Sequence, residues 1–337
     1  MKSSAILAVL GLTALGLAGA APAQSAPTYA VTDRIKIDDG NFDYASFDPV
    51  HRRLYVSRVG GVLALDVDTG KLTSHLADAQ RSHESLPLED GAMLLITDSG
   101  SNSAHIVDAL TGKAMAEIPA GKKPDAAIFD PASGLALAMN GASGDVTLID
   151  PKTQKAVGSI AIGGALEFAA ADGAGKVFVN IEDKGQIAVL DTKAQKLIGQ
   201  YPMKGCEEPS GLAYAPDAGV LIVACASQVA KVVNAATGEE VASLPIGKGP
   251  DAVIYDADRH LAFIPCGRDG VLEVIAVRGP KDVAIVQTLK TQPGARTGAV
   301  DPKTGKIYLP TAAYTLSPTG RPTPTPGTFA ILVVSPG

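Results

Sequence analysis

Acidic side chains recur at one position of a repeating unit, and they are the residues in this chain best suited to chemistry. The position lies five residues before an aspartate that recurs along the chain. In chain order it holds Asp43, Ser85, Asp125, Glu167, Ser210, Asp251 and Arg296. The second unit is ambiguous by one residue, so Glu84 can replace Ser85, with His83 beside it. This pattern predicts a ring of carboxylates interrupted by one arginine.

Such a ring is suited to several kinds of chemistry. Clustered carboxylate oxygens can hold Ca²⁺ or Mg²⁺, bind a cationic ligand, or shift one another's pKa values for acid–base work. The expected ligand-binding residues are Asp43, His83, Glu84, Asp125, Glu167, Asp251 and Arg296. If a metal is bound, its expected ligands are Asp43, Asp125, Glu167 and Asp251.

Two simpler roles stay open for these residues. An aspartate before a strand often accepts hydrogen bonds from nearby backbone N–H groups in a turn. The Pro-Asp-Ala segments at 124–126 and 250–252 suit that role. Arg296 can grip a carboxylate or phosphate ligand, or it can form an internal ion pair with Asp251 or Asp43.

A repeat of 40 to 45 residues positions these side chains. The recurrent aspartate slot is occupied in order by Asp48, Asp90, Asp130, Asp172, Ala215, Asp256 and Asp301. A second marker, the turn sequence typified by DVDTGK at 66–71, keeps the same spacing. Each unit contains four short apolar runs separated by Gly, Pro and Asp turns, as residues 124–163 illustrate. A period of this length with four strands per unit is typical of β-propeller blades.

The expected fold is therefore all-β, a seven-bladed β-propeller formed by a single domain over residues 28–337. The seventh unit has only three runs, and residues 28–37 form a spare strand before the first unit. We expect this N-terminal strand to complete the last blade, since closure removes exposed strand edges.

In a propeller, the loops that precede the innermost strands meet at one face with the loops that join the second and third strands. The first set carries the acidic ring. The second set carries Arg58, Asn140, Cys225, Cys266 and Thr311. A proline-rich loop at 317–327 is expected to be stiff and to cover part of the same face, unless it is only decorative.

Composition excludes some classes of partner. Lysine and arginine total 29 against 35 aspartate and glutamate, a net charge of −6, with no basic run. Nucleic acid is therefore not expected as a partner, because phosphate neutralisation needs clustered basic residues. The chain has no Trp, which argues against a sugar-stacking site.

The first residues resemble a secretory signal peptide. Lys2 precedes a short apolar run and then small residues, so residues 1–23 are expected to be removed. The alternative is a membrane anchor, but the run is short and rich in Ala and Gly. The mature protein is expected to be periplasmic or secreted, with no membrane insertion after cleavage.

The three cysteines are Cys206, Cys225 and Cys266. Antiparallel pairing within the fifth unit brings Cys206 and Cys225 together, so a disulfide is expected there, with Cys266 left free. A cluster of thiols around a metal is the alternative, although no CxxC or Cys–His spacing supports it.

No familiar catalytic motif appears in the sequence. The five histidines are isolated, and HExxH, GxSxG, GxGxxG and phosphate-binding loop patterns are missing from it. Among the histidines, only His83 maps to the acidic face.

Several segments resemble the YVTN-type, YncE-like β-propeller family: RLYVSR at 53–58, GDVTLIDPKTQKAVGSI at 144–160 and GQIAVLDTKAQKLIG at 185–199. Residues 55–58 read YVSR in place of the family's Tyr-Val-Thr-Asn. The resemblance spans roughly residues 28–337 and implies a seven-bladed propeller, often exported by bacteria, without a single activity. DNA binding, described for some relatives, finds no support in the acidic balance of this chain.

Taken together, the residues favour an exported binding or scaffold protein rather than an enzyme. Its partner would be a small ligand, an ion or a periplasmic protein held at the acidic face. The alternative is a metal-dependent, lactonase-like hydrolase that uses the carboxylate ring. A redox-associated role has no residue to support a haem or quinone, and the cofactor, if any, is unknown.

Overall fold

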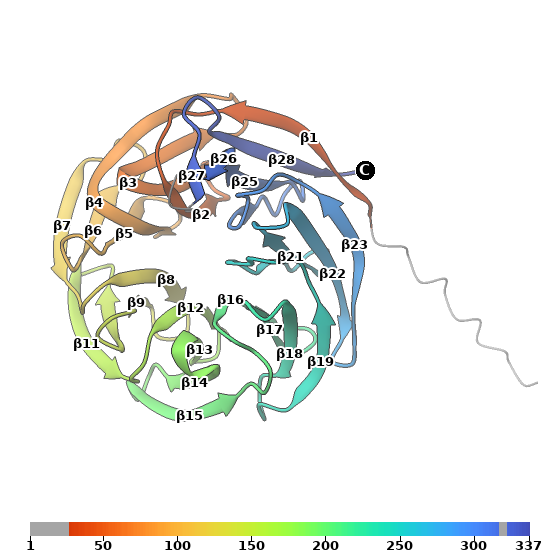
Figure 1. The fold of residues 1–337 in the computed structure, drawn as a ribbon. Helices are drawn as coiled ribbons and strands as arrows, with labels where there is room; N and C mark the ends of the chain where they lie inside the picture. Colours follow the sequence, from red (N-terminus) through yellow and green to blue (C-terminus); the bar gives the residue numbers. More distant parts are fainter. Residues whose placement is uncertain (1–26, 317–321) are drawn as a thin grey trace, which may run out of the picture.

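A computed structural model describes residues 27–316 and 322–337. These residues form an all-β propeller whose sheets are arranged in a ring around a central axis, and the region around this axis is called the channel below (Figure 1). The described part contains no α-helix, only a 3₁₀ turn, η1 (Glu182–Lys184). No helix within it is long and apolar enough to span a bilayer. The expected signal peptide, residues 1–23, lies outside the described residues.

Four consecutive sheets follow the chain from β2 to β19. The first contains β2 (Phe42–Asp48), β3 (Arg53–Asp66), β4 (Leu72–Leu88), β5 (Met93–Asp98), β6 (Ser103–Asp108) and β7 (Ala114–Pro119). The second contains β8 (Pro124–Asp130), β9 (Leu135–Asn140), β10 (Asp145–Asp150) and β11 (Lys155–Ala161). The third contains β12 (Leu166–Ala171), β13 (Lys176–Ile181), β14 (Gln186–Asp191) and β15 (Lys196–Pro202). The fourth contains β16 (Pro209–Ala215), β17 (Val220–Cys225), β18 (Val229–Asn234) and β19 (Glu240–Pro245).

The remaining strands complete the ring. One sheet contains β20 (Ile254–Asp256), β21 (Leu261–Cys266), β22 (Val271–Gly279) and β23 (Asp282–Lys290). The last contains β24 (Ala299–Val300), β25 (Ile307–Thr311), β28 (Ala330–Pro336) and β1 (Tyr29–Lys36). A small hairpin, β26 (Tyr314–Leu316) and β27 (Pro322–Pro324), projects between β25 and β28.

The N-terminal strand closes the ring, as the sequence predicts. β1 pairs antiparallel with β28, from Tyr29 opposite Pro336 to Lys36 opposite Ala330. The backbone N–H and C=O of Tyr29 also bond the side chain of Gln287 on the neighbouring β23. The two ends of the chain therefore hold one sheet together.

The predicted count of seven blades is wrong as a count of sheets, because the described residues form six large sheets. The difference lies in the first, six-stranded sheet. β4 is 17 residues long and continues without a break from its pairing with β3 to its pairing with β5. The innermost strands nevertheless contact one another around the whole ring, in the order β2, β4, β8, β12, β16, β20, β24 and back to β2.

The hydrophobic core lies between neighbouring sheets. One cluster, for example, joins Leu137 and Leu148 of the second sheet to Val177 and Leu190 of the third, all fully buried. Each such side chain contributes about 1.5–3 kcal/mol on burial. Packing of this kind fixes the sheets relative to one another, and so fixes the loops at the channel end.

The recurrent aspartates lie at the opposite ends of the innermost strands and cap turns. Asp48 and Asp301 are buried, and they accept hydrogen bonds from the backbone N–H of Val50 (2.9 Å) and Lys303 (3.0 Å). Arg52 joins Asp301 across two sheets, with Nη2 2.8 Å from Oδ2. These markers are structural, which explains why they repeat.

Candidate functional site

A repeated β-bulge aims the predicted site residues into the channel. The pairing register shifts around the site position in five inner strands: β2, β4, β8, β12 and β16. In each strand the shift lies between the residue just before the site position and the residue two after it. In β8, for example, the shift falls between Pro124 and Ala127, so Asp125 lies inside the bulge. A bulge bends the strand and turns a side chain away from the ladder direction. The sequence therefore positions these residues through a local irregularity that recurs from sheet to sheet.

The same register corrects the assignment in the second unit. Leu88 pairs with Met93 just as Asp48 pairs with Arg53, so Leu88 and not Asp90 is the equivalent of the marker. The turn after β4 has the same length as the others, but its aspartate, Asp90, lies two residues beyond the marker position, which displaced the count by two residues. His83, five residues before Leu88, therefore occupies the site position. Ser85 does not, and its buried Oγ lies 2.6 Å from Ser57 Oγ.

His83 joins two of the predicted aspartates. Its Nδ1 lies 2.6 Å from Asp43 Oδ2 and 3.2 Å from Asp125 Oδ1. The other oxygen of Asp125 is 2.9 Å from Lys123 Nζ. Burial opposes protonation of His83, but the hydrogen bond to Asp43 and the charge of Asp125 outweigh it and raise its pKa above the usual value.

Arg296 links the other side of the same group. Its Nη2 lies 3.3 Å from Asp43 Oδ1, and its Nε lies 2.8 Å from Asp251 Oδ2 without a well-aligned hydrogen bond. The internal ion pair expected as an alternative role for Arg296 is therefore present with both aspartates. Within the described part of the chain, the side chains of Asp125 and Asp251 contact cationic groups and not the turn N–H groups considered from the sequence.

Three carboxyl groups of this face are strongly perturbed. Burial raises the pKa of Glu84 to about 8, and the charges of Asp43 and Asp125 add to the effect. Burial, with Asp125 and Asp251 nearby, raises the pKa of Glu167 to about 9, and Tyr44 Oη donates to its Oε2 at 3.2 Å. Burial raises the pKa of Asp251 to about 7, although Arg296 opposes the shift.

A cavity of about 460 Å³ opens beside Arg296. Arg268, Asp251 and Tyr314 of the β26–β27 hairpin also line it. Two glycines make room for these side chains. A Cβ on Gly267 would lie 2.7 Å from Arg296 Cβ, and one on Gly294 (φ +100°) would lie 2.4 Å from the Tyr314 ring. An adjoining cavity of about 400 Å³ shares Arg268 and Asp251 and extends past Lys248 towards acidic residues, Glu182 and Glu208.

The predicted metal ligands do not form one group. Asp43 and Asp125 come together with His83, and one donor atom from each lies within 4.8 Å of the others. Glu167 and Asp251 instead contact Tyr44 and Arg296. The carboxylates of Asp43 and Asp125 are already paired with the side chains of His83, Lys123 and Arg296. A metal bound there would have to displace the N–H of His83 and compete with the two ion pairs.

Other residues expected at this face divide into structural and site roles. Arg58 is buried and donates from Nη2 to the backbone oxygen of Asp38 at 2.9 Å. Asn140 is buried and bonds Thr147 Oγ1 at 2.9 Å. Ser210 Oγ donates to the backbone oxygen of Pro250 at 3.1 Å. Thr311 Oγ1 lies 3.4 Å from the backbone oxygen of Pro293, next to the cavity-lining Gly294.

The proline-rich loop reaches this face in part. Residues 317–321 lie outside the described residues, whereas 322–327 run back towards β28. Gly327 donates its N–H to the carboxylate of Asp39, at 2.7 and 2.9 Å to the two oxygens. Tyr314, just before the loop, supplies a cavity wall.

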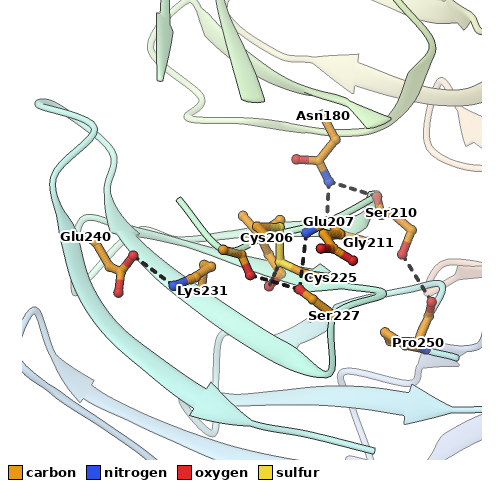
Figure 2. The surroundings of a disulfide bond; sticks show 12 residues. Asn180, Cys206, Glu207, Ser210, Gly211, Cys225, Ser227, Lys231, Glu240 and Pro250 are labelled. Carbon is orange, nitrogen blue, oxygen red and sulfur yellow. Dashed lines mark hydrogen bonds and ion pairs between the residues drawn. A yellow bond between two sulfur atoms is a disulfide. The ribbon is translucent and has the colours of Figure 1, made fainter. Parts of the chain in front are cut away.

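The predicted disulfide is present. Cys206 and Cys225 are bonded, and Cys266 is buried and free (Figure 2). The disulfide holds the loop before β16, which is further fixed by hydrogen bonds from Ser227 Oγ to Gly205 O and from Glu207 N to Ser227 Oγ. It therefore supports the edge of the channel next to Ser210. The alternative prediction, a cluster of thiols around a metal, is wrong because Cys206 and Cys225 are bonded to each other.

Sequence reasoning missed five residues of this face: Tyr44, Ser99, Lys123, Arg268 and Tyr314. Lys123 and Tyr44 each neighbour a predicted residue by one or two positions, so the repeat alignment could have drawn attention to them. Arg268 lies in the β21–β22 turn, where the equivalent β9–β10 turn has Ala142, so the repeat gives no sign of a cation there. Tyr314 belongs to the β26–β27 hairpin, which the other described sheets lack.

Comparison with known proteins shows the fold alone. A chain of hydrazine synthase from Kuenenia stuttgartiensis superposes with a TM-score of 0.72 at 15% identity, covering 87% of this chain and 97% of that one. A chain from the crystal structure of a mitotic checkpoint complex superposes with a TM-score of 0.73 at 12% identity, covering 98% of both. No family model matches the sequence, and no curated protein does. The structural neighbours and the sheet arrangement together establish a β-propeller.

Proposed function

We propose that this chain is an exported β-propeller that binds a small anionic ligand at the channel end, in the cavity between Arg268, Arg296 and Tyr314. The cavity itself is the observation that carries the proposal. It has a volume of about 460 Å³ and places two guanidinium groups and an aromatic ring around one space. Small-molecule sites are typically concavities of this size with a few convergent polar groups.

Charge favours an anion over a cation. Arg296 is already paired with aspartates, but the raised pKa of Asp251, about 7, means that this carboxyl is partly protonated at neutral pH. Arg268 is exposed and has no ion pair among the described residues. A guanidinium is well suited to a carboxylate, which it can bind through two parallel hydrogen bonds. The Tyr314 ring offers a flat apolar surface for the rest of the ligand.

The metal-dependent hydrolase remains the alternative. Its support is the close approach of Asp43, His83 and Asp125. We favour the binding role because those carboxylates are already paired with His83, Lys123 and Arg296, whereas the cavity offers a cation without such a partner.

We further propose seven repeat units within the ring, with the six-stranded sheet corresponding to two blades fused through β4. The seven innermost strand segments and the equivalent bulges support this division. The YVTN-type resemblance, the signal-like residues 1–23 and the disulfide are consistent with an exported member of that family.

Benzoate and its uncharged analogue benzamide test the binding role. We expect benzoate to raise the melting temperature of the protein in a dose-dependent way, and benzamide to have no such effect. Arg268→Gln is expected to weaken benzoate binding at least about tenfold, because a hydrogen bond to a charged group contributes about 1.5–3 kcal/mol.

Arg278→Gln is a matched control, since Arg278 is an exposed arginine of the same sheet whose ion pair is with Asp282, away from the cavity. Equal responses to benzoate and benzamide, or equal benzoate binding by Arg268→Gln and wild type, would refute an anion site at this cavity.

A further inference from the structure

A chain of three polar side chains lies on the side of the channel end away from Arg268. Ser99 Oγ is 2.8 Å from His83 Nε2, and His83 Nδ1 is 2.6 Å from Asp43 Oδ2. A hydroxyl, an imidazole and a carboxylate therefore follow one another at hydrogen-bonding distance. This is the order of nucleophile, base and orienting acid that activates a serine in acyl transfer.

The surroundings of His83 determine which nitrogen can act as the base. Both Asp43 and Asp125 face Nδ1, so the proton of the neutral ring is held on that nitrogen. Nε2 then presents a lone pair to the Ser99 hydroxyl. The residue His83 is 4% exposed, which excludes most water from this contact.

The backbone holds the serine and the histidine in fixed relation. Ser99 follows β5 in the tight turn that leads to β6, and His83 lies in the bulge of β4. The buried carboxylate of Asp98 accepts hydrogen bonds from Arg81 N at 2.8 Å and Gly100 N at 2.9 Å. Ser99 N donates to Arg81 O at 3.1 Å. The residues flanking Ser99 and the strand carrying His83 are thus tied to each other, while the Ser99 side chain stays partly accessible to solvent.

We infer that Ser99 is a nucleophile, His83 its general base and Asp43 the residue that orients His83, and that this group hydrolyses small carboxylic esters. Ser99 Oγ forms a bond to the ester carbonyl carbon while its proton passes to His83 Nε2. The bond from that carbon to the alcohol oxygen then breaks, and His83 returns the proton to the departing alcohol. Water, deprotonated by His83, cleaves the acyl-serine to release the acid and restore Ser99.

Charged groups on every side of His83 bear on when the base is available. Asp43 and Asp125 favour the protonated ring, and Arg81 opposes it. Lys123 and Arg296 offset the two aspartates through their ion pairs. Because only the neutral ring can accept the Ser99 proton, the reaction is expected to accelerate as pH rises through the elevated pKa of His83.

A fluorophosphonate probe tests the nucleophile directly. It forms a bond from phosphorus to an activated serine oxygen with loss of fluoride, and the adduct is measured by intact mass and located by peptide mapping. We expect one adduct on wild type, on Ser99. The rate should fall at least about 100-fold in Ser99→Ala and His83→Asn, the scale of general-base assistance.

Ser101→Ala is the matched control in the same turn, because Ser101 Oγ contacts Ser103 Oγ and the Asp98 backbone instead of His83. It is expected to label and to hydrolyse 4-nitrophenyl acetate as wild type does. Asp43→Asn should slow both reactions and shift the pH profile, which a purely structural role would not do.

Failure of wild type to label, or an adduct that maps to another residue, would overturn the inference whether or not the variants fold. Equal labelling of wild type and a folded Ser99→Ala would do the same. The two proposals fail separately: a wild type that labels on Ser99 but responds equally to benzoate and benzamide refutes the binding role alone, and a wild type that binds benzoate but does not label refutes this inference alone.

Discussion

The buried carboxyl of Glu84 makes the stability of this propeller sensitive to pH, and Glu84→Gln isolates the effect. Glu84 is 3% exposed, and its Oε1 accepts a hydrogen bond from Ser85 N at 2.9 Å. Burial raises the pKa of Glu84 from 4.5 to about 8, with Asp43 and Asp125 adding to the shift. A glutamine keeps the shape and the acceptor oxygen but does not titrate.

The sign follows from proton binding in the two states. Between about pH 4.5 and pH 8 the folded protein holds a proton on Glu84 that the unfolded chain has released, so the free energy of unfolding falls as pH rises. The ordinary pKa of a glutamate, 4.5, lies 2.5 units below pH 7. At about 1.4 kcal/mol per unit, the loss at pH 7 relative to pH 4.5 is about 3 kcal/mol.

Urea unfolding at pH 5, 6, 7 and 8 measures this slope. We expect wild type to lose stability across the range and Glu84→Gln to lose about 2.5 kcal/mol less between pH 5 and pH 7. Glu167 and Asp251 titrate in the same direction, but they remain in both proteins and cancel in the difference. Glu117→Gln, which alters an exposed glutamate of β7, is the control and should retain the wild-type slope. Parallel pH profiles for wild type and Glu84→Gln would refute the reasoning.

Three further changes probe the framework. Replacing Cys206 and Cys225 with serine should lower the free energy of unfolding by about 3 kcal/mol in urea titration, the value for a disulfide closing a loop of this length; no change would show that the bond adds nothing. Arg52→Ala should cost about 3–5 kcal/mol, because it leaves the buried Asp301 unpaired between two sheets, and a melting temperature within a degree of wild type would contradict that role. Deleting residues 29–36 should expose the edge of β28 and yield aggregates in size-exclusion chromatography, whereas a monomer with wild-type melting would disprove closure by β1.

Much of the architecture could be predicted because it depends on a repeated local pattern. Four apolar runs between Gly, Pro and Asp turns specify strands wherever they occur, and the unpaired ends at 28–37 and in the last unit predict closure by β1. The number of separate sheets could not be predicted. It depends on whether β4 breaks between its two partners, and residues 77–83, where it passes from one partner to the other, contain no Gly or Pro.

The site was predictable in position but not in charge balance. Periodicity places Asp43, Asp125 and Asp251 at one channel end. It does not show that Arg296 lies beside Asp43, because that contact joins sheets far apart in sequence. Nor does it show that Lys123 turns its side chain towards Asp125, two residues later. Leu88 also stands where other units have aspartate, and Asp90 was counted in its place, which made Ser85 appear in the place of His83. Ser99 occupies a turn position where equivalent turns have Gly141 and Gly267, so the repeat gives no sign of a hydroxyl there.

A fragment screen by ligand-observed NMR, with carboxylic acids paired to their neutral amides, tests the central claim most directly. The account predicts that acids bind more often and more tightly than their amides. It also predicts that the acids lose affinity in Arg268→Gln but not in Arg278→Gln. Acids and amides binding equally, a preference for cationic fragments, or acids that bind Arg268→Gln as they bind wild type would contradict an anion site at the cavity of Arg268, Arg296 and Tyr314.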